Sequence, residues 1–221
     1  MLIDKLPKGI CSLIENLRVN NGTKKMKLLM YITITALMSI NTAFAGDIVG
    51  TVKATGTKDS GNAIIFLEKV EGKTFSPPAE HAVMNQKNMT FIPHVLPVLA
   101  GTTVDFQNND DVLHNVFSPD KCADNFNLGT WPKGQIRSYT FKNPGCRASL
   151  LCKVHPEMEG YVVVLETPYF AVSNKDGSYS IKNVPAGTYT LNIWHEKLKG
   201  ASVKVTVPAS GSVTQDFEIK K

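Results

Sequence analysis

The feature that most constrains the fold is a series of short strand-like segments separated by regular turn signals. Residues 102–107 alternate polar and apolar residues, which places Val104 and Phe106 on one face of a strand. Residues 174–177 (Asn-Lys-Asp-Gly) and 184–187 (Val-Pro-Ala-Gly) have the composition of tight turns. No segment after the first 45 residues reads as a long helix. We therefore predict an all-β protein built from β-sandwiches.

The first 45 residues have the composition of a secretory signal peptide. The basic segment Lys24-Lys25-Met26-Lys27 precedes a mostly apolar segment, residues 28–40, and Ala43-Phe44-Ala45 matches an A-x-A cleavage site. We expect residues 1–45 to be removed and Gly46 to begin the mature chain, which places it in the periplasm or outside the cell. Met26 begins a complete signal peptide by itself, which favours Met26 as the true start; a long leader beginning at Met1 is the alternative.

Most of the net charge of +5 belongs to this leader. It holds six of the 24 basic residues and two of the 19 acidic ones, which leaves 18 against 17 and a mature charge of +1. There is no basic stripe and no interleaved aromatic pattern, so we expect no nucleic-acid partner. The apolar segment of the leader is short for a membrane span, so we expect no membrane association after cleavage.

A thiolate, an imidazole and a thioether lie within one short segment, Cys152-Lys-Val-His155-Pro-Glu-Met158. A second histidine, His114, lies upstream. One Cys, two His and a weak axial Met are the ligands of a blue-copper site, whereas zinc favours a closed Cys/His tetrahedron without a thioether. We predict that His114, Cys152, His155 and Met158 bind one type 1 copper. The alternative is a buried Cys and Met in a strand-end turn beside a surface His.

Export also affects what we expect of the remaining cysteines, because an oxidising compartment allows disulfides to form. Cys11 leaves with the leader, and Cys122 and Cys146 remain beside Cys152. With Cys152 on a metal, the other two are free to form a disulfide in an oxidising compartment. Two independent thiols are the alternative.

The sequence contains no arrangement typical of a catalytic site. There is no nucleophile elbow, phosphate-binding glycine loop, HExxH or Cys-x-x-Cys motif, and no His-x-His pair of the kind found in multicopper oxidases. A copper whose coordination positions are filled by protein offers no place for a substrate. We therefore expect a protein that is not an enzyme.

The segment that contains the proposed ligands resembles a known family. Residues 83–166 are similar to cupredoxins of the plastocyanin and amicyanin group, and the short spacing of Cys152, His155 and Met158 is the amicyanin-like form. The resemblance implies a Greek-key β-sandwich, a protein electron donor and acceptor, and a route for electrons through His155. It also implies that the backbone N–H of Asn115 binds the Cys152 sulfur. The whole chain resembles periplasmic proteins labelled as methylamine-utilisation proteins.

A second resemblance concerns the C-terminal part. Residues 170–194 are similar to the regulatory-domain β-sandwich of carboxypeptidases, and residues 50–52 and 62–65 resemble the first two strands of that family. We therefore expect a strand pair at 47–53 and 62–70, with the cupredoxin inserted after it. The expected domains are the leader at 1–45, strands and linker at 46–80, cupredoxin at 81–166, and the rest of the smaller sandwich at 167–221.

Three functional hypotheses remain open from the sequence. The first is a periplasmic one-electron carrier. The second is a copper-binding or copper-handling protein without an electron-transfer role, and the third is an extracellular interaction module in which the copper site is structural. We expect His81, His94 and His195 to be non-ligands. Trp131 is expected either to frame a partner-docking surface or to pack as an ordinary loop residue.

Overall fold

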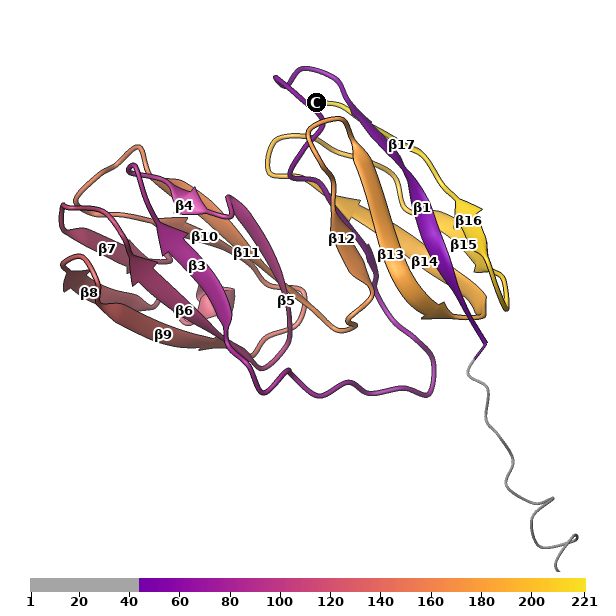
Figure 1. Ribbon diagram of the computed structural model, residues 1–221, viewed down its shortest axis with the longest axis horizontal. Helices are drawn as coiled ribbons and strands as arrows, with labels where there is room; N and C mark the ends of the chain where they lie inside the picture. Colours follow the sequence, from indigo (N-terminus) through magenta and orange to yellow (C-terminus); the bar gives the residue numbers. More distant parts are fainter. Residues whose placement is uncertain (1–43) are drawn as a thin grey trace, which may run out of the picture. The chain divides into compact units, whose positions relative to one another are not determined.

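The computed structural model describes residues 44–221, and Figure 1 shows their arrangement. The predicted leader, residues 1–45, which includes the favoured start at Met26, lies almost entirely outside the described residues. Within residues 44–221 the regular structure consists of strands and one short 3₁₀ helix, η2 (Lys121–Ala123). The prediction of an all-β protein with two sandwiches is confirmed. No helix in this part of the chain is long and apolar enough to cross a membrane.

The strands between residues 82 and 165 form the larger sandwich, whose two sheets enclose one apolar core (Figure 1). The first sheet has the order β4 (Phe91–Ile92), β3 (Ala82–Gln86), β6 (Thr102–Asn108), β9 (Ile136–Phe141). The second has the order β5 (Val95–Leu99), β11 (Glu159–Leu165), β10 (Arg147–Leu151), β7 (His114–Phe117), β8 (Asn127–Trp131).

The alternation in β6 explains how this core forms. Val104 and Phe106 are fully buried, as predicted, while Thr103 points to the other face and its hydroxyl bonds that of Thr140 on β9 at 2.9 Å. Side chains of successive strand residues point to opposite faces, so one face of the strand joins the core and the other remains polar. β11 departs from this pattern because Val162 to Leu165 are all buried. That continuous burial shows that both faces of β11 are covered.

The remaining strands form a smaller sandwich with its own core. One sheet contains β13 (Ser178–Pro185), β1 (Ala45–Ala54), β16 (Ser212–Thr214) and β17 (Phe217–Ile219). The other has the order β12 (Phe170–Val172), β2 (Ile64–Leu67), β14 (Gly187–Trp194), β15 (Val203–Val207).

The expectation that residues 47–53 and 62–70 form a strand pair is wrong. β1 pairs with β13, β16 and β17, whereas β2 pairs with β12 and β14 in the other sheet. The connection between β1 and β2 crosses from one sheet to the other, so the two strands lie in opposite sheets of the smaller sandwich. Both strands precede the larger sandwich in the sequence, but their partners all follow it. The strands of residues 82–165 are thus inserted between the second and third strands of the smaller sandwich.

The registers show where the inserted segment begins and ends. At the start of β3, Ala82 pairs with Val104, and at its end Gln86 pairs with Asn108. At the end of β11, Leu165 pairs with Leu99. Val104 and Leu99 flank the β5–β6 turn, whereas Asn108 leads toward His114. The chain therefore enters and leaves the larger sandwich at the end of its sheets away from His114.

A third apolar cluster covers the outer face of β5 and β11. It brings Val95, Val163 and Leu165 of the larger sandwich against Ile64 and Phe66 of β2. This contact accounts for the burial of both faces of β11.

Candidate metal centre

Three strand ends meet to position the predicted ligands. His114 is the first residue of β7, Cys152 directly follows β10, and His155 and Met158 lie in the loop that leads into β11. β7 and β10 are neighbours in one sheet, joined where Phe117 pairs with Leu151. This pairing places residue 114 and residues 152–158 at the same end of the sheet. The amide of Met158 donates to the carbonyl of His155 at 3.0 Å, which closes the loop into a tight turn.

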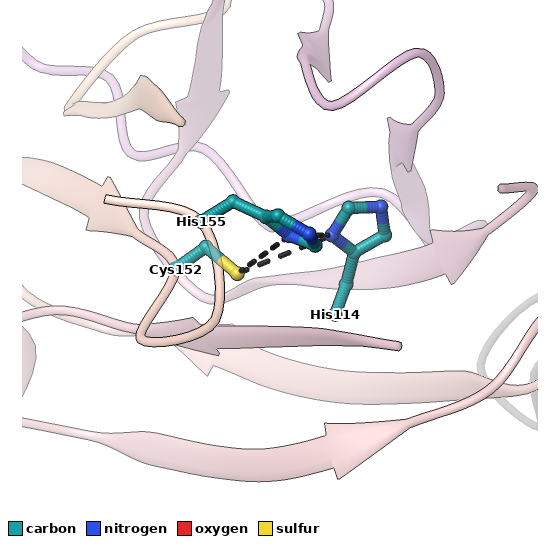
Figure 2. Close-up of side chains that lie close together, drawn as sticks. All are labelled: His114, Cys152 and His155. Carbon is teal, nitrogen blue, oxygen red and sulfur yellow. Dashed lines mark hydrogen bonds between the residues drawn. The ribbon is translucent and has the colours of Figure 1, made fainter. Parts of the chain in front are cut away.

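His114, Cys152 and His155 point toward one another (Figure 2). The Nδ1 atoms of His114 and His155 are 3.1 Å apart, and the Cys152 Sγ lies 4.0 Å from the first and 3.8 Å from the second. His114 is fully buried, Cys152 and Met158 are nearly so, and His155 is partly exposed. Of the four predicted ligands, the structure thus brings three donor atoms to one point and places the fourth residue, Met158, in the adjoining core.

The hydrogen bond of the His114 Nε2 atom determines the tautomer of this histidine. Its Nε2 lies 2.8 Å from the Asp110 Oδ2, and a carboxylate can only accept, so Nε2 carries the proton and Nδ1 presents a lone pair. Burial opposes ionisation of Asp110, but backbone N–H groups and the His114 imidazole hold the pKa of its carboxyl below the usual range. Asp110 was not among the predicted site residues. An acidic residue four positions before a ligand histidine was the available signal.

These donors fit a single soft metal ion. The His114 lone pair faces the His155 nitrogen at 3.1 Å beside a buried thiol. A metal with bonds of about 2.0 Å to nitrogen and about 2.3 Å to sulfur can join a nitrogen and a sulfur up to about 4.3 Å apart and two nitrogens up to about 4.0 Å apart. All three separations lie within these limits. Two imidazoles, one cysteine and a buried methionine are the donor set that suits copper.

Asn115 connects the two chain segments that carry the ligands. Its backbone N–H donates to the Cys152 Sγ at 3.4 Å, and its side-chain Oδ1 accepts from the amide of Lys153 at 3.3 Å. The Nδ2 of the same side chain donates to Asn127 at 2.9 Å and to the carbonyl of Gly129 at 2.6 Å. Asn115 is buried, so these bonds hold β7, β8 and the Cys152 loop together away from solvent.

Several exposed side chains of the ligand loops are apolar, and the charged Lys153 and Glu157 are exposed there as well. Val112 and Leu113 precede His114 and are 46% and 52% exposed, and Val154 precedes His155 and is 44% exposed. Pro156, directly after His155, is also exposed. Large exposed apolar side chains next to one another are characteristic of interaction surfaces.

The other histidines lie apart from these donors. His81 bonds Asp105 at 2.9 Å on the surface, and His94 pairs with Glu196 at 3.2 Å. Burial lowers the pKa of His195, whose Nδ1 accepts from the amide of Lys197. None of the three belongs to the cluster of metal-donor side chains found among residues 44–221.

The structure distinguishes between the alternatives that the sequence left open for Trp131 and for Cys122 and Cys146. Trp131 is fully buried opposite His114 on β8, so it packs in the core and frames no docking surface. Cys122 and Cys146 form a disulfide. Cys152 is the one free cysteine in residues 44–221.

Fold and site together define a cupredoxin domain, and its cofactor is one copper. Comparison with family models supports this: residues 79–165 match the model described as copper binding proteins, plastocyanin/azurin family. This part of the chain is similar to that family. Residues 157–220 match the carboxypeptidase regulatory-like domain. The second match begins two residues before β11 and includes that strand, which pairs with β5 and β10 of the larger sandwich, and it omits β1 and β2.

Comparisons with whole proteins gave two results. A search of curated proteins finds no match. Among solved structures, an oxidised point mutant of amicyanin is 28% identical with a TM-score of 0.36, covering 38% of this chain and 81% of the other. A purple cupredoxin from Nitrosopumilus maritimus is 26% identical with a TM-score of 0.34, covering 38% and 98%. A copper-containing nitrite reductase from Thermus scotoductus SA-01 is 26% identical with a TM-score of 0.38, covering 46% and 25%.

Proposed function

We propose that the mature protein, beginning at Gly46, is an exported one-electron carrier with a type 1 copper bound by His114, Cys152, His155 and Met158. The observation that carries the proposal is the convergence of one sulfur and two imidazole nitrogens in a largely buried cluster, with a buried methionine in the adjoining core. The predicted secretory leader and the Cys122–Cys146 disulfide support an oxidising compartment.

Hydrogen bonds from several parts of the chain fix the ligand residues in place. Asp110 orients the buried imidazole of His114, the Asn115 amide bonds the Cys152 sulfur, and the turn between His155 and Met158 fixes the loop. Bound copper supplies a Cu(I)/Cu(II) couple. A site fixed by these contacts before metal binding rearranges little when one electron is gained or lost. With four protein donors around the metal, no position is left for a substrate, which supports a carrier over an enzyme.

Electrons would enter and leave through His155. Its ring joins the donor cluster on one side and is partly exposed on the other, whereas His114 is fully buried. Val154 and Pro156 surround it with exposed apolar surface. A mature charge of +1 provides little long-range attraction, so we propose that a donor or acceptor protein docks by apolar contact at this surface.

The test of the copper site uses residues 46–221 loaded with copper. We expect an intense visible absorption from charge transfer between the Cys152 thiolate and copper, and a reversible voltammetric wave. Cys152→Ser should abolish the absorption because an alcohol cannot replace the thiolate. An unchanged spectrum in that variant would exclude the ligand set. Copper binding without a reversible wave would instead support the copper-handling alternative.

The docking surface has a separate test, the rate of electron self-exchange between two copies of the protein. Pro156→Glu should slow exchange while leaving the absorption spectrum nearly unchanged, because it places a carboxylate beside the exposed edge of His155. Val83→Glu is the matched control, since Val83 is an exposed apolar residue on β3, 44% exposed, near the opposite end of the sheets. Equal rates in the two variants would contradict the assignment.

A further inference from the structure

Among residues 44–221, Asp110 is the one charged side chain that bonds a proposed copper ligand. Its carboxylate accepts from the His114 Nε2 at 2.8 Å and from the backbone N–H groups of Asn88 at 2.6 Å and Met89 at 2.9 Å. The side chain is only 12% exposed. A single carboxylate therefore bonds the buried imidazole and the turn between β3 and β4, which belongs to the opposite sheet.

The turn presents these two amides through an uncommon backbone conformation. Asn88 and Met89 both have positive φ, 53° and 54°, a region that non-glycine residues seldom occupy. The Asp110 backbone is held as well, because its amide donates to the Asn108 Oδ1 at 2.9 Å. The carboxylate thus has a fixed place relative to His114, independent of any metal.

The neighbouring aspartate shows that this arrangement is specific to position 110. Asp111 carries the same charge one residue along the chain, but its side chain is 89% exposed and pairs with Lys133 at 2.7 Å. It has no hydrogen bond to His114, Asn88 or Met89. The two positions therefore separate the effect of a nearby negative charge from the effect of a hydrogen bond to the ligand.

We propose, on the basis of the copper site proposed above, that Asp110 is a positioning residue that fixes His114 for Cu(II) and lowers the reduction potential of the centre. A carboxylate that accepts the second N–H of a ligand imidazole fixes the ring orientation and tautomer and makes the metal-facing nitrogen more basic. A more basic ligand and a nearby negative charge both favour Cu(II) over Cu(I). Asp110 also preorganises the copper-free protein, because the bond exists without the metal.

The test compares Asp110→Asn with the matched control Asp111→Asn at one fixed pH. Loss of such a partner weakens metal binding by about 10- to 100-fold, and we expect this loss for Cu(II) in Asp110→Asn. The reduction potential should rise if the affinity for Cu(II) falls more than the affinity for Cu(I). Each tenfold difference between the two losses of affinity corresponds to a rise of about 59 mV. Asp111→Asn should change both quantities little. Competition with a chelator measures the affinity, and voltammetry measures the potential.

A second measurement, on the copper-free protein, separates this proposal from the copper function. Nitrogen NMR of His114 should show a single Nε2–H tautomer in the wild type and a mixture in Asp110→Asn. If the wild type binds no copper, the proposed function fails. The NMR spectrum still tests whether Asp110 fixes the tautomer of His114.

Asp110→Glu provides a variant that keeps the charge. Its longer side chain misplaces the carboxylate, so its Cu(II) affinity should lie between those of the wild type and Asp110→Asn. If Asp110→Asn does not fold, the Glu variant decides the outcome. The proposal would be overturned if the variant that folds had the same copper affinity, reduction potential and His114 tautomer as the wild type. Equal changes in Asp110→Asn and Asp111→Asn would also overturn it.

Discussion

Asn115→Ala should weaken both the fold and the copper site, because this one side chain joins three segments. Its amide group makes three hydrogen bonds, to Asn127, to the Gly129 carbonyl and to the Lys153 amide, and Asn115 is only 2% exposed. A net contribution of about 1 kcal/mol for each bond predicts a loss of about 3 kcal/mol in the free energy of unfolding. Urea unfolding of the copper-free protein measures this quantity.

The same substitution should alter the copper potential in a defined direction. The backbone N–H of Asn115 donates to the Cys152 Sγ at 3.4 Å, and it is held in place by the side-chain bonds. A hydrogen bond withdraws electron density from the thiolate, so loosening it strengthens donation to Cu(II). The reduction potential should therefore fall, in contrast to the rise expected for Asp110→Asn.

Asn143→Ala is the control for these effects. Asn143 is exposed and makes one side-chain bond, to the Cys122 carbonyl at 2.7 Å, away from the ligands. It should lose no more than about 1 kcal/mol and leave the potential unchanged. If Asn115→Ala proves as stable as Asn143→Ala, or if its potential equals that of the wild type, the role assigned to the Asn115 side chain is wrong.

Three further predictions concern the rest of the molecule. Replacing Cys122 and Cys146 by Ala should cost about 3.5 kcal/mol in urea unfolding, because their separation of 24 residues closes a long loop in the unfolded chain; unchanged stability would show that the bridge does not form. Gly160→Ala should lower stability by about 1–3 kcal/mol, since a new Cβ would lie 2.8 Å from the Cβ of buried Phe91; an unchanged Tm would contradict this. N-terminal sequencing of protein secreted by a bacterial host should begin at Gly46, and an intact leader would refute export.

The parts of the site that could be predicted from sequence are those encoded locally. Cys152, His155 and Met158 lie in one short loop, so their residue types and spacing together indicate the metal. The burial of Val104 and Phe106 follows from the alternation in β6, because a strand has only two faces. His114 could be included because it is a second histidine within the segment that resembles cupredoxins.

The parts that could not be predicted depend on which distant segments come together. The bond between Asp110 and His114 requires a particular loop path, and the turn at Asn88 and Met89 that completes it belongs to another sheet. The strand pairing of β1 likewise depends on partners more than a hundred residues away. Neither periodicity nor composition specifies such long-range register.

The insertion has a physical consequence for the proposed carrier. The chain enters the larger sandwich at Ala82 and leaves it after Leu165, and their strand partners lie at the end of the sheets away from His114. The smaller sandwich covers the outer face of β11 through Val163 and Leu165. Val154 and Pro156, in the loop that carries Cys152 and His155, are exposed with the smaller sandwich present, so they remain available to a partner protein. The smaller sandwich can therefore be joined to the copper domain without obstructing the surface through which His155 would exchange electrons.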